Sequence, residues 1–86
     1  MSKERRKKIK DIFLKYKKAK VNNDLEYIRA IETALSLIPE RQSKALQLKY
    51  MYYLGPNTIS FELSVDRSSV YRYLNDGEDM LLQLIE

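Results

Sequence analysis

Five hydrogen-bonding side chains lie close together in the last quarter of this chain of 86 residues. Two are arginines, and the full set is Arg67, Ser68, Tyr71, Arg72 and Asn75. Arginine can donate two parallel hydrogen bonds to O6 and N7 of guanine, and a good pair of this kind discriminates between bases by about 1–3 kcal/mol. We therefore predict that these five residues contact DNA bases from a helix in the major groove.

Two short helices and a tight turn would position these side chains. A helix over about residues 58–63, a turn over residues 64–66 and a second helix capped by Asp66 fit the order of polar and apolar residues. Apolar residues of the two helices can pack together: Ile59, Leu63, Val70 and Leu74. This layout is typical of a helix-turn-helix, whose second helix enters the major groove of double-stranded DNA.

Contacts with phosphate would orient such a motif on the duplex. Serine hydroxyls and the N–H groups at a helix N-terminus both suit this role. We assign it to polar and basic residues on and near the two helices: Asn57, Thr58, Ser69, Arg41 and Lys44.

The composition excludes several functional classes. The chain has no cysteine and no histidine, and no Gly-rich phosphate loop, so thiolate and imidazole chemistry are absent. We expect no enzymatic activity, no cofactor, no metal site and no small-molecule substrate. No apolar run approaches a membrane span and no signal peptide opens the chain, so we expect one domain, 1–86, in the reducing cytoplasm and no contact with a membrane.

Positive charge is concentrated in a basic N-terminal helix or arm, residues 1–22. Residues 1–20 hold ten Lys or Arg and two acids, whereas residues 21–86 hold six Lys or Arg and ten acids. Candidates for a non-specific polyanion contact are Arg5, Arg6, Lys7, Lys8 and Lys10. A solvated arm, a phosphate contact beside the helix-turn-helix and docking on an acidic protein surface all remain open.

The helical spacing of apolar residues predicts an all-α fold, a small bundle of four to five helices ending in the helix-turn-helix. The helices are expected over about residues 3–19, 24–37, 39–53, 58–63 and 66–84. The second is a packing helix within segment 23–38, and segment 39–86 carries the helix-turn-helix.

Short-range signals predict where these helices begin and end. Asn23 has the spacing of a capping box, and Gly55 suits a left-handed position after the third helix. Asn57 or Thr58 can cap the fourth helix. We expect the fifth helix to continue through Gly77, with a break there as the alternative.

Three stretches carry a family resemblance: Ile38-Pro39-Glu40-Arg41-Gln42, Leu48-Lys49-Tyr50, and then Ile59, Leu63, Val65 and Val70. With eight residues between Tyr50 and Ile59, they resemble region 4, the promoter-recognition domain of bacterial sigma factors. The likeness covers about residues 37–84. It implies a DNA-binding regulator of transcription, with RNA polymerase as a further partner.

The chain departs from that family pattern at several positions. Ser64 stands where the family usually has a turn glycine, Ser60 where it has alanine, and Thr58 where it has an acid. Asp66 replaces the usual serine and Ser69 the usual threonine. Because serine resists the positive φ that glycine accepts, Ser64 puts the geometry of the turn in question.

A chain of 86 residues leaves no room for the clamp-binding domain of a full sigma factor. A basic N-terminal helical part followed by a region-4-like end is similar to phage and prophage regulators of late genes, of the ArpU and RinA type. Two alternatives stay open. One is a region-4-like protein that binds RNA polymerase or another regulator instead of DNA, and the other is the DNA-binding part of a phage packaging subunit, similar to a small terminase.

The third helix carries Tyr50, Tyr52 and Tyr53, and one side of a helix cannot bury all three in so small a domain. Tyrosine is favoured at protein interfaces, so we assign the cluster to a protein interface, with a homodimer as one outcome. Acidic residues near the C-terminus are expected to form a solvated face: Asp76, Glu78, Asp79 and Glu86.

Overall fold

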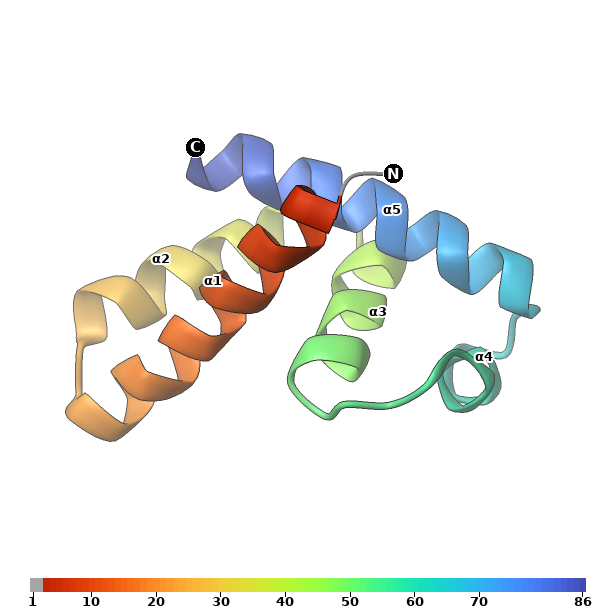
Figure 1. Cartoon of the computed structure of the whole chain (residues 1–86), viewed down its shortest axis with the longest axis horizontal. Helices are drawn as coiled ribbons and strands as arrows, with labels where there is room; N and C mark the ends of the chain where they lie inside the picture. Colours follow the sequence, from red (N-terminus) through yellow and green to blue (C-terminus); the bar gives the residue numbers. More distant parts are fainter. Residues whose placement is uncertain (1–2) are drawn as a thin grey trace.

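The computed structural model describes residues 3–86, which form five α-helices and no strand. Their bounds are α1 Lys3–Asn22, α2 Leu25–Leu37, α3 Glu40–Tyr50, α4 Pro56–Leu63 and α5 Arg67–Ile85. The long α5 contacts each of the other four helices, with α4 at its beginning, α3 below its middle and the α1–α2 pair toward its end (Figure 1). The prediction of an all-α bundle is confirmed, and the first two residues of the predicted 1–22 arm lie outside the described residues.

The basic helix α1 is part of the bundle. Its apolar stripe is buried at Ile9, Phe13 and Tyr16, because these residues recur at helical spacing and face α2 and α5. The Tyr16 hydroxyl also donates to a carboxylate oxygen of Glu32 in α2, at 2.8 Å. Residues 3–22 therefore pack on the rest of the domain and do not form a free arm.

The junction between α1 and α2 differs from the predicted capping box. Asn23 adopts a left-handed φ of 58°, and the Asp24 N–H donates to the Ala19 carbonyl at 2.9 Å, which closes α1. The N-cap of α2 is Asp24, whose side chain accepts from the Tyr27 N–H. The capping box at Asn23 was wrong because asparagine tolerates left-handed backbone and is used here to end the preceding helix.

The junction between α3 and α4 also differs from expectation. The third helix ends at Tyr50, about three residues early, and the left-handed residue is Tyr53, with φ 59°. Gly55 is extended, with φ −78°, and serves as N-cap of α4, so neither Asn57 nor Thr58 caps that helix. Pro56 occupies the first turn of α4, where its missing N–H costs nothing because that position has no helical acceptor.

The fifth helix runs unbroken through Gly77, as predicted. A Cβ added at Gly77 would lie 3.1 Å from the Gln42 carbonyl oxygen and 3.1 Å from two side-chain atoms of Leu46. Glycine at this point lets α5 approach α3 closely. The other buried residues of the hydrophobic core are Ile9, Phe13, Tyr16, Ile31, Ala34, Leu35, Ile38, Ala45, Tyr50, Ile59, Val70, Leu74 and Leu81.

Gly77→Ala is expected to destabilise the fold. Alanine would gain about 1 kcal/mol in helix propensity, but overpacking against the buried Leu46 costs about 1–3 kcal/mol, so we expect a net loss of about 1 kcal/mol. That loss corresponds to a melting temperature lower by about 5 °C in a domain of this size. Circular dichroism melting measures it, with Gly55→Ser as control because nothing lies within 4 Å of a Cβ there. A Gly77→Ala variant that melts above the wild type would contradict the packing argument.

The radius of gyration of the described chain is 12.6 Å, close to the value of about 12 Å expected for a compact domain of this length. Within residues 3–86, no helix combines the length and the apolar character needed to cross a membrane.

Candidate nucleic-acid interface

The turn between α4 and α5 is held by three local hydrogen bonds. Ser64 adopts the left-handed conformation, φ 57° and ψ 44°, and the Val65 N–H donates to the Ser60 carbonyl at 3.1 Å. The Ser64 N–H donates to the Phe61 carbonyl at 3.2 Å. The Ser60 hydroxyl donates to the Val65 carbonyl at 2.6 Å. Serine therefore reaches the geometry that glycine would take freely, and the Ser60 hydroxyl helps to hold it there.

Asp66 fixes the start of α5, as predicted. Its carboxylate accepts from the Ser69 N–H at 3.0 Å and from the Ser68 hydroxyl at 3.1 Å. Hydrogen bonds from Ser69 and Ser68 lower the pKa of the Asp66 carboxyl below its ordinary value, so this cap is negatively charged at neutral pH. The cap orients the first turn of α5, which carries Arg67.

The predicted packing of the two helices is present. Ile59 of α4 and Val70 and Leu74 of α5 are buried in the core, and Leu63 packs against them. Because these apolar residues face inward, the opposite side of the first turns of α5 is exposed and polar. In the described chain, no other helix covers that side of α5 (Figure 1).

Four of the predicted base-contact residues lie on this exposed surface: Arg67, Ser68, Tyr71 and Arg72. The Arg67 guanidinium donates to the Tyr71 hydroxyl at 3.0 Å and lies 5.8 Å from the centre of its ring. The Arg72 guanidinium lies 5.5 Å from the centre of the Tyr73 ring. Each arginine is thus placed beside a tyrosine, which restricts its conformations before any ligand binds.

The Arg72–Tyr73 pair also contacts α3. Arg41 donates to the Tyr73 hydroxyl at 3.2 Å, and this hydrogen bond, together with Arg72, lowers the pKa of Tyr73 below its ordinary value. Arg41, a predicted phosphate contact, therefore lies beside α5. Ser69 is half-buried at the start of α5, and Asn57 and Thr58 are exposed in the first turn of α4.

Asn75 and Arg5 occupy a different place from the one expected. The Asn75 side-chain oxygen accepts from the Arg5 guanidinium at 3.1 Å, and Arg5 also pairs with Asp79. Arg5 lies 3.4 Å from a carboxylate oxygen of Glu78. Because α1 crosses α5 at this point, the side chains of Asn75 and Arg5 bind each other in the contact between the two helices.

Glu78 is not part of a solvated acidic face, because only 1% of the residue is exposed. Its second carboxylate oxygen accepts from the Tyr50 hydroxyl at 2.7 Å. Burial and this hydrogen bond raise the pKa of Tyr50 well above its ordinary value. Glu78 follows Leu74 by four residues and precedes Leu81 by three, and this helical spacing is a signal that could have placed it inside.

Tyr50 is buried and stacks on Phe13, with ring centres 5.3 Å apart. It therefore does not belong to an exposed tyrosine cluster, and the predicted interface keeps only Tyr52 and Tyr53, which are 66% and 72% exposed. The prediction assumed that Tyr50, Tyr52 and Tyr53 all lie on the third helix. In the structure α3 ends at Tyr50, and Tyr52 and Tyr53 follow it outside the helix.

The predicted basic run divides among several surroundings. Lys7 is exposed, and Lys8 lies 3.6 Å from a carboxylate oxygen of Glu86. Arg6 and Lys10 are exposed on α1. Burial lowers the pKa of Lys49 in α3, and the charges of Arg6 and Lys10 lower it further, while Glu78 and Tyr71 raise it.

Arg6 and Lys10 of α1 and Lys49 of α3 therefore form a basic cluster beside Tyr71, close enough for their charges to interact. Lys49 was missed as a site residue. Its signal was present, because it is the basic residue at the centre of the segment Leu48-Lys49-Tyr50 quoted above.

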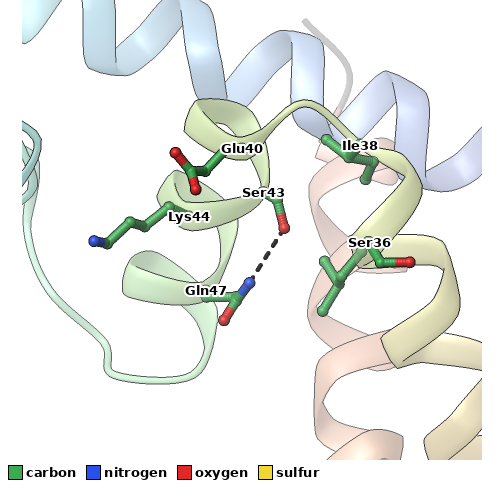
Figure 2. Close-up of a pocket in the computed structure, with 7 residues that line it drawn as sticks. Ser36, Ile38, Glu40, Ser43, Lys44 and Gln47 are labelled. Atoms are coloured by element: carbon green, nitrogen blue, oxygen red, sulfur yellow. Dashed lines mark hydrogen bonds between the residues drawn. The ribbon is translucent and has the colours of Figure 1, made fainter.

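Lys44 lies on an open hollow of about 410 Å³ between the end of α2 and α3. Figure 2 shows Ser36 and Ile38 on one side of it, the Gln47 amide donating to the Ser43 hydroxyl at 3.2 Å, and Lys44 extending away from Ser36 and Ile38. The lining is shallow and mixed in polarity, so we do not treat it as a binding site. Lys44 is exposed on the same helix as Arg41.

No family model, no curated protein and no solved structure matches this chain in the three comparisons made.

Proposed function

We propose that this protein binds double-stranded DNA in a sequence-directed manner and regulates transcription, with α5 in the major groove. The observation that supports this best is the exposed row Arg67, Ser68, Tyr71 and Arg72 on the first turns of a helix that follows a well-formed tight turn. Arginine and hydroxyl side chains at the start of a recognition helix are suited to base edges. A charged cap and two Arg–Tyr pairs position these groups in advance.

Phosphate contacts would flank α5 on both sides. Arg41 lies on the Tyr73 side, and the basic cluster of Arg6, Lys10 and Lys49 lies on the Tyr71 side. Arg5 contributes indirectly, because it pairs with Asp79 and Glu78 and so offsets negative charge that would repel phosphate. Asn57, Thr58, Ser69 and Lys44 are further phosphate contacts in this proposal.

The resemblance to sigma region 4 supports transcription as the process, a phage or prophage as the source, and the cytoplasm as the location. RNA polymerase is the second partner in this proposal. The exposed pair Tyr52 and Tyr53 supports a homodimer as the form that binds, since paired copies would read two half-sites.

The second candidate function is binding to RNA polymerase or to another regulator instead of to DNA. The observation that favours it is the pair Asp76 and Asp79 farther along α5, because acids on a recognition helix would face phosphate. Asp79 is paired with Arg5, however, so its repulsion of phosphate is reduced.

The double variant Arg6→Gln/Lys10→Gln tests the placement of the duplex. If both side chains contact phosphate, the slope of log affinity against log salt concentration should become shallower by about 1.8, which is about 0.9 per contact. Fluorescence anisotropy with a labelled duplex over a range of salt concentrations measures the slope.

The matched control is Lys8→Gln/Lys15→Gln, which removes the same charge from other parts of α1, near Glu86 and over the Tyr27 ring of α2. We expect this control to change the slope much less. Equal changes in the two double variants would mean that α1 acts only through bulk charge and would contradict the proposed position of the duplex.

A further inference from the structure

A groove between α1 and α3 lies outside the surface assigned to DNA bases. Its volume is about 390 Å³, which is enough to hold one or two large side chains, and its lining is mainly aromatic and aliphatic. The residues that line it are Lys10, Phe13, Leu14, Lys49, Tyr50 and Tyr53. The stacked rings of Phe13 and Tyr50 are its buried part.

Two apolar side chains at this groove are open to solvent. Leu14 is 50% exposed, although it lies one residue from the buried Phe13, and Tyr53 is 72% exposed. Leu14 does not belong to the hydrophobic core, and the Tyr53 ring lies against Lys17 of α1. Exposed apolar side chains gathered at a groove are characteristic of a surface that contacts a partner.

Tyr53 is also held in an unfavourable backbone conformation. Its φ of 59° is one that glycine or asparagine accepts and that a bulky residue rarely adopts. The position closes the end of α3, where a glycine would serve the fold better. Residues in such conformations cluster at ligand-binding sites, and this one holds the Tyr53 ring against Lys17 at the groove.

The charges at the rim identify the occupant. Lys49 lies with its ammonium 5.0 Å from the centre of the Tyr50 ring, and Lys17 lies 3.7 Å from the centre of the Tyr53 ring. Lys10 is the third cation, and none of the six lining residues is acidic. Three ammonium groups around an apolar groove complement a segment that carries carboxylates beside an apolar side chain.

We infer that this groove binds an acidic, amphipathic peptide segment of a partner protein. One large apolar side chain of the segment enters between Leu14 and Tyr53, and its carboxylates pair with Lys10, Lys17 and Lys49. The mainly apolar lining favours a peptide over nucleic acid, because phosphate seeks polar donors and gains nothing from aliphatic surface. This inference does not depend on the proposed base contacts of Arg67 and Arg72, which lie on α5. It shares Lys10 and Lys49 with the proposed phosphate contacts, so peptide and duplex DNA are expected to compete for these two lysines.

The test uses random peptides displayed on yeast and selected on the immobilised full chain. Tyr53→Asn is the key variant, because asparagine suits the left-handed backbone and the variant should melt at or above the wild-type temperature. We expect recovered peptides to be enriched in Asp and Glu around one large apolar residue. We also expect at least tenfold weaker binding to Tyr53→Asn and to Leu14→Ser, and unchanged binding to the control Leu25→Ser, which alters an exposed leucine on α2.

Three results would overturn the inference. One is a selection in which no peptide prefers the wild type over Tyr53→Asn. A second is a set of peptides without acidic enrichment or without an apolar residue. The third is a Tyr53→Asn variant that loses duplex DNA binding while keeping peptide binding, which would assign the groove to nucleic acid. Loss of DNA binding in Arg72→Ala, by contrast, would leave the peptide result unaffected.

Discussion

Replacing Arg72 by alanine should weaken binding to the preferred DNA sequence by about 5- to 150-fold, because one bidentate base contact supplies about 1–3 kcal/mol of discrimination. Binding to unrelated duplex DNA should fall much less, since that binding depends on the number of phosphate contacts. Arg72 is exposed and lies beside the Tyr73 ring, so its removal leaves the core intact. Titrations of both duplexes by fluorescence anisotropy give the two losses.

Two further variants separate the role of Arg72 from that of its charge. Arg72→Lys keeps the positive charge but cannot form the planar fork, so we expect most of the specific loss to remain. Arg29→Ala removes an exposed arginine from α2 and should leave both affinities near the wild-type values. Equal losses on specific and unrelated DNA in Arg72→Ala would reduce Arg72 to a phosphate contact.

Replacing Arg5 by methionine should destabilise the fold by about 3 kcal/mol, because removal of one partner leaves the buried carboxylate of Glu78 without its compensating charge. The Arg5 side chain is 16% exposed and that of Glu78 only 2%, so water can reach this charge poorly. We place the cost at the lower end of the range for buried pairs because Tyr50 still donates to Glu78. Urea unfolding measures the difference in the free energy of unfolding.

The double variant Arg5→Met/Glu78→Met should be more stable than Arg5→Met alone, since it removes the uncompensated charge together with its partner. Lys8→Met is the control, because its pair with Glu86 is exposed and such pairs contribute about 0.5 kcal/mol or less. If Arg5→Met and Lys8→Met cost the same, the α1–α5 contact would not depend on the Glu78 charge.

Local patterns predicted the helices well. The spacing of Ile9, Phe13 and Tyr16 predicted the buried stripe of α1, and Asp66 was recognised as the cap of α5. Both features depend on residues within a few positions of one another, so the sequence alone contains what is needed. The unbroken course of α5 through Gly77 followed from the same apolar register.

The errors arose where distant elements decide the outcome. Glu78 was expected in water, but α1 crosses α5 there and brings Arg5 to it, and no local pattern contains that crossing. The same crossing engages Asn75. At the end of α3, the glycine rule pointed to Gly55, whereas the left-handed residue is Tyr53, whose ring lies against Lys17 of α1.

The candidate site was predictable in part. Arg67 and Arg72 follow from the helix-turn-helix pattern, and the structure places both on the exposed side of α5. The proximity of Lys49 to Arg6 and Lys10 could be recognised only in the folded structure, because the three residues come from two helices far apart in the chain.

The central claim is that α5 reads DNA sequence, and selection from a library of random duplexes at a salt concentration of about 150 mM tests it most directly. The wild-type chain and the Arg72→Ala variant are selected in parallel, and the recovered duplexes are sequenced. We predict one defined motif for the wild type, containing a guanine at the position read by Arg72, and loss of preference at that position in the variant. Recovery of no motif, with weak binding that disappears as salt rises, would contradict the claim and reduce the protein to a non-specific polyanion binder.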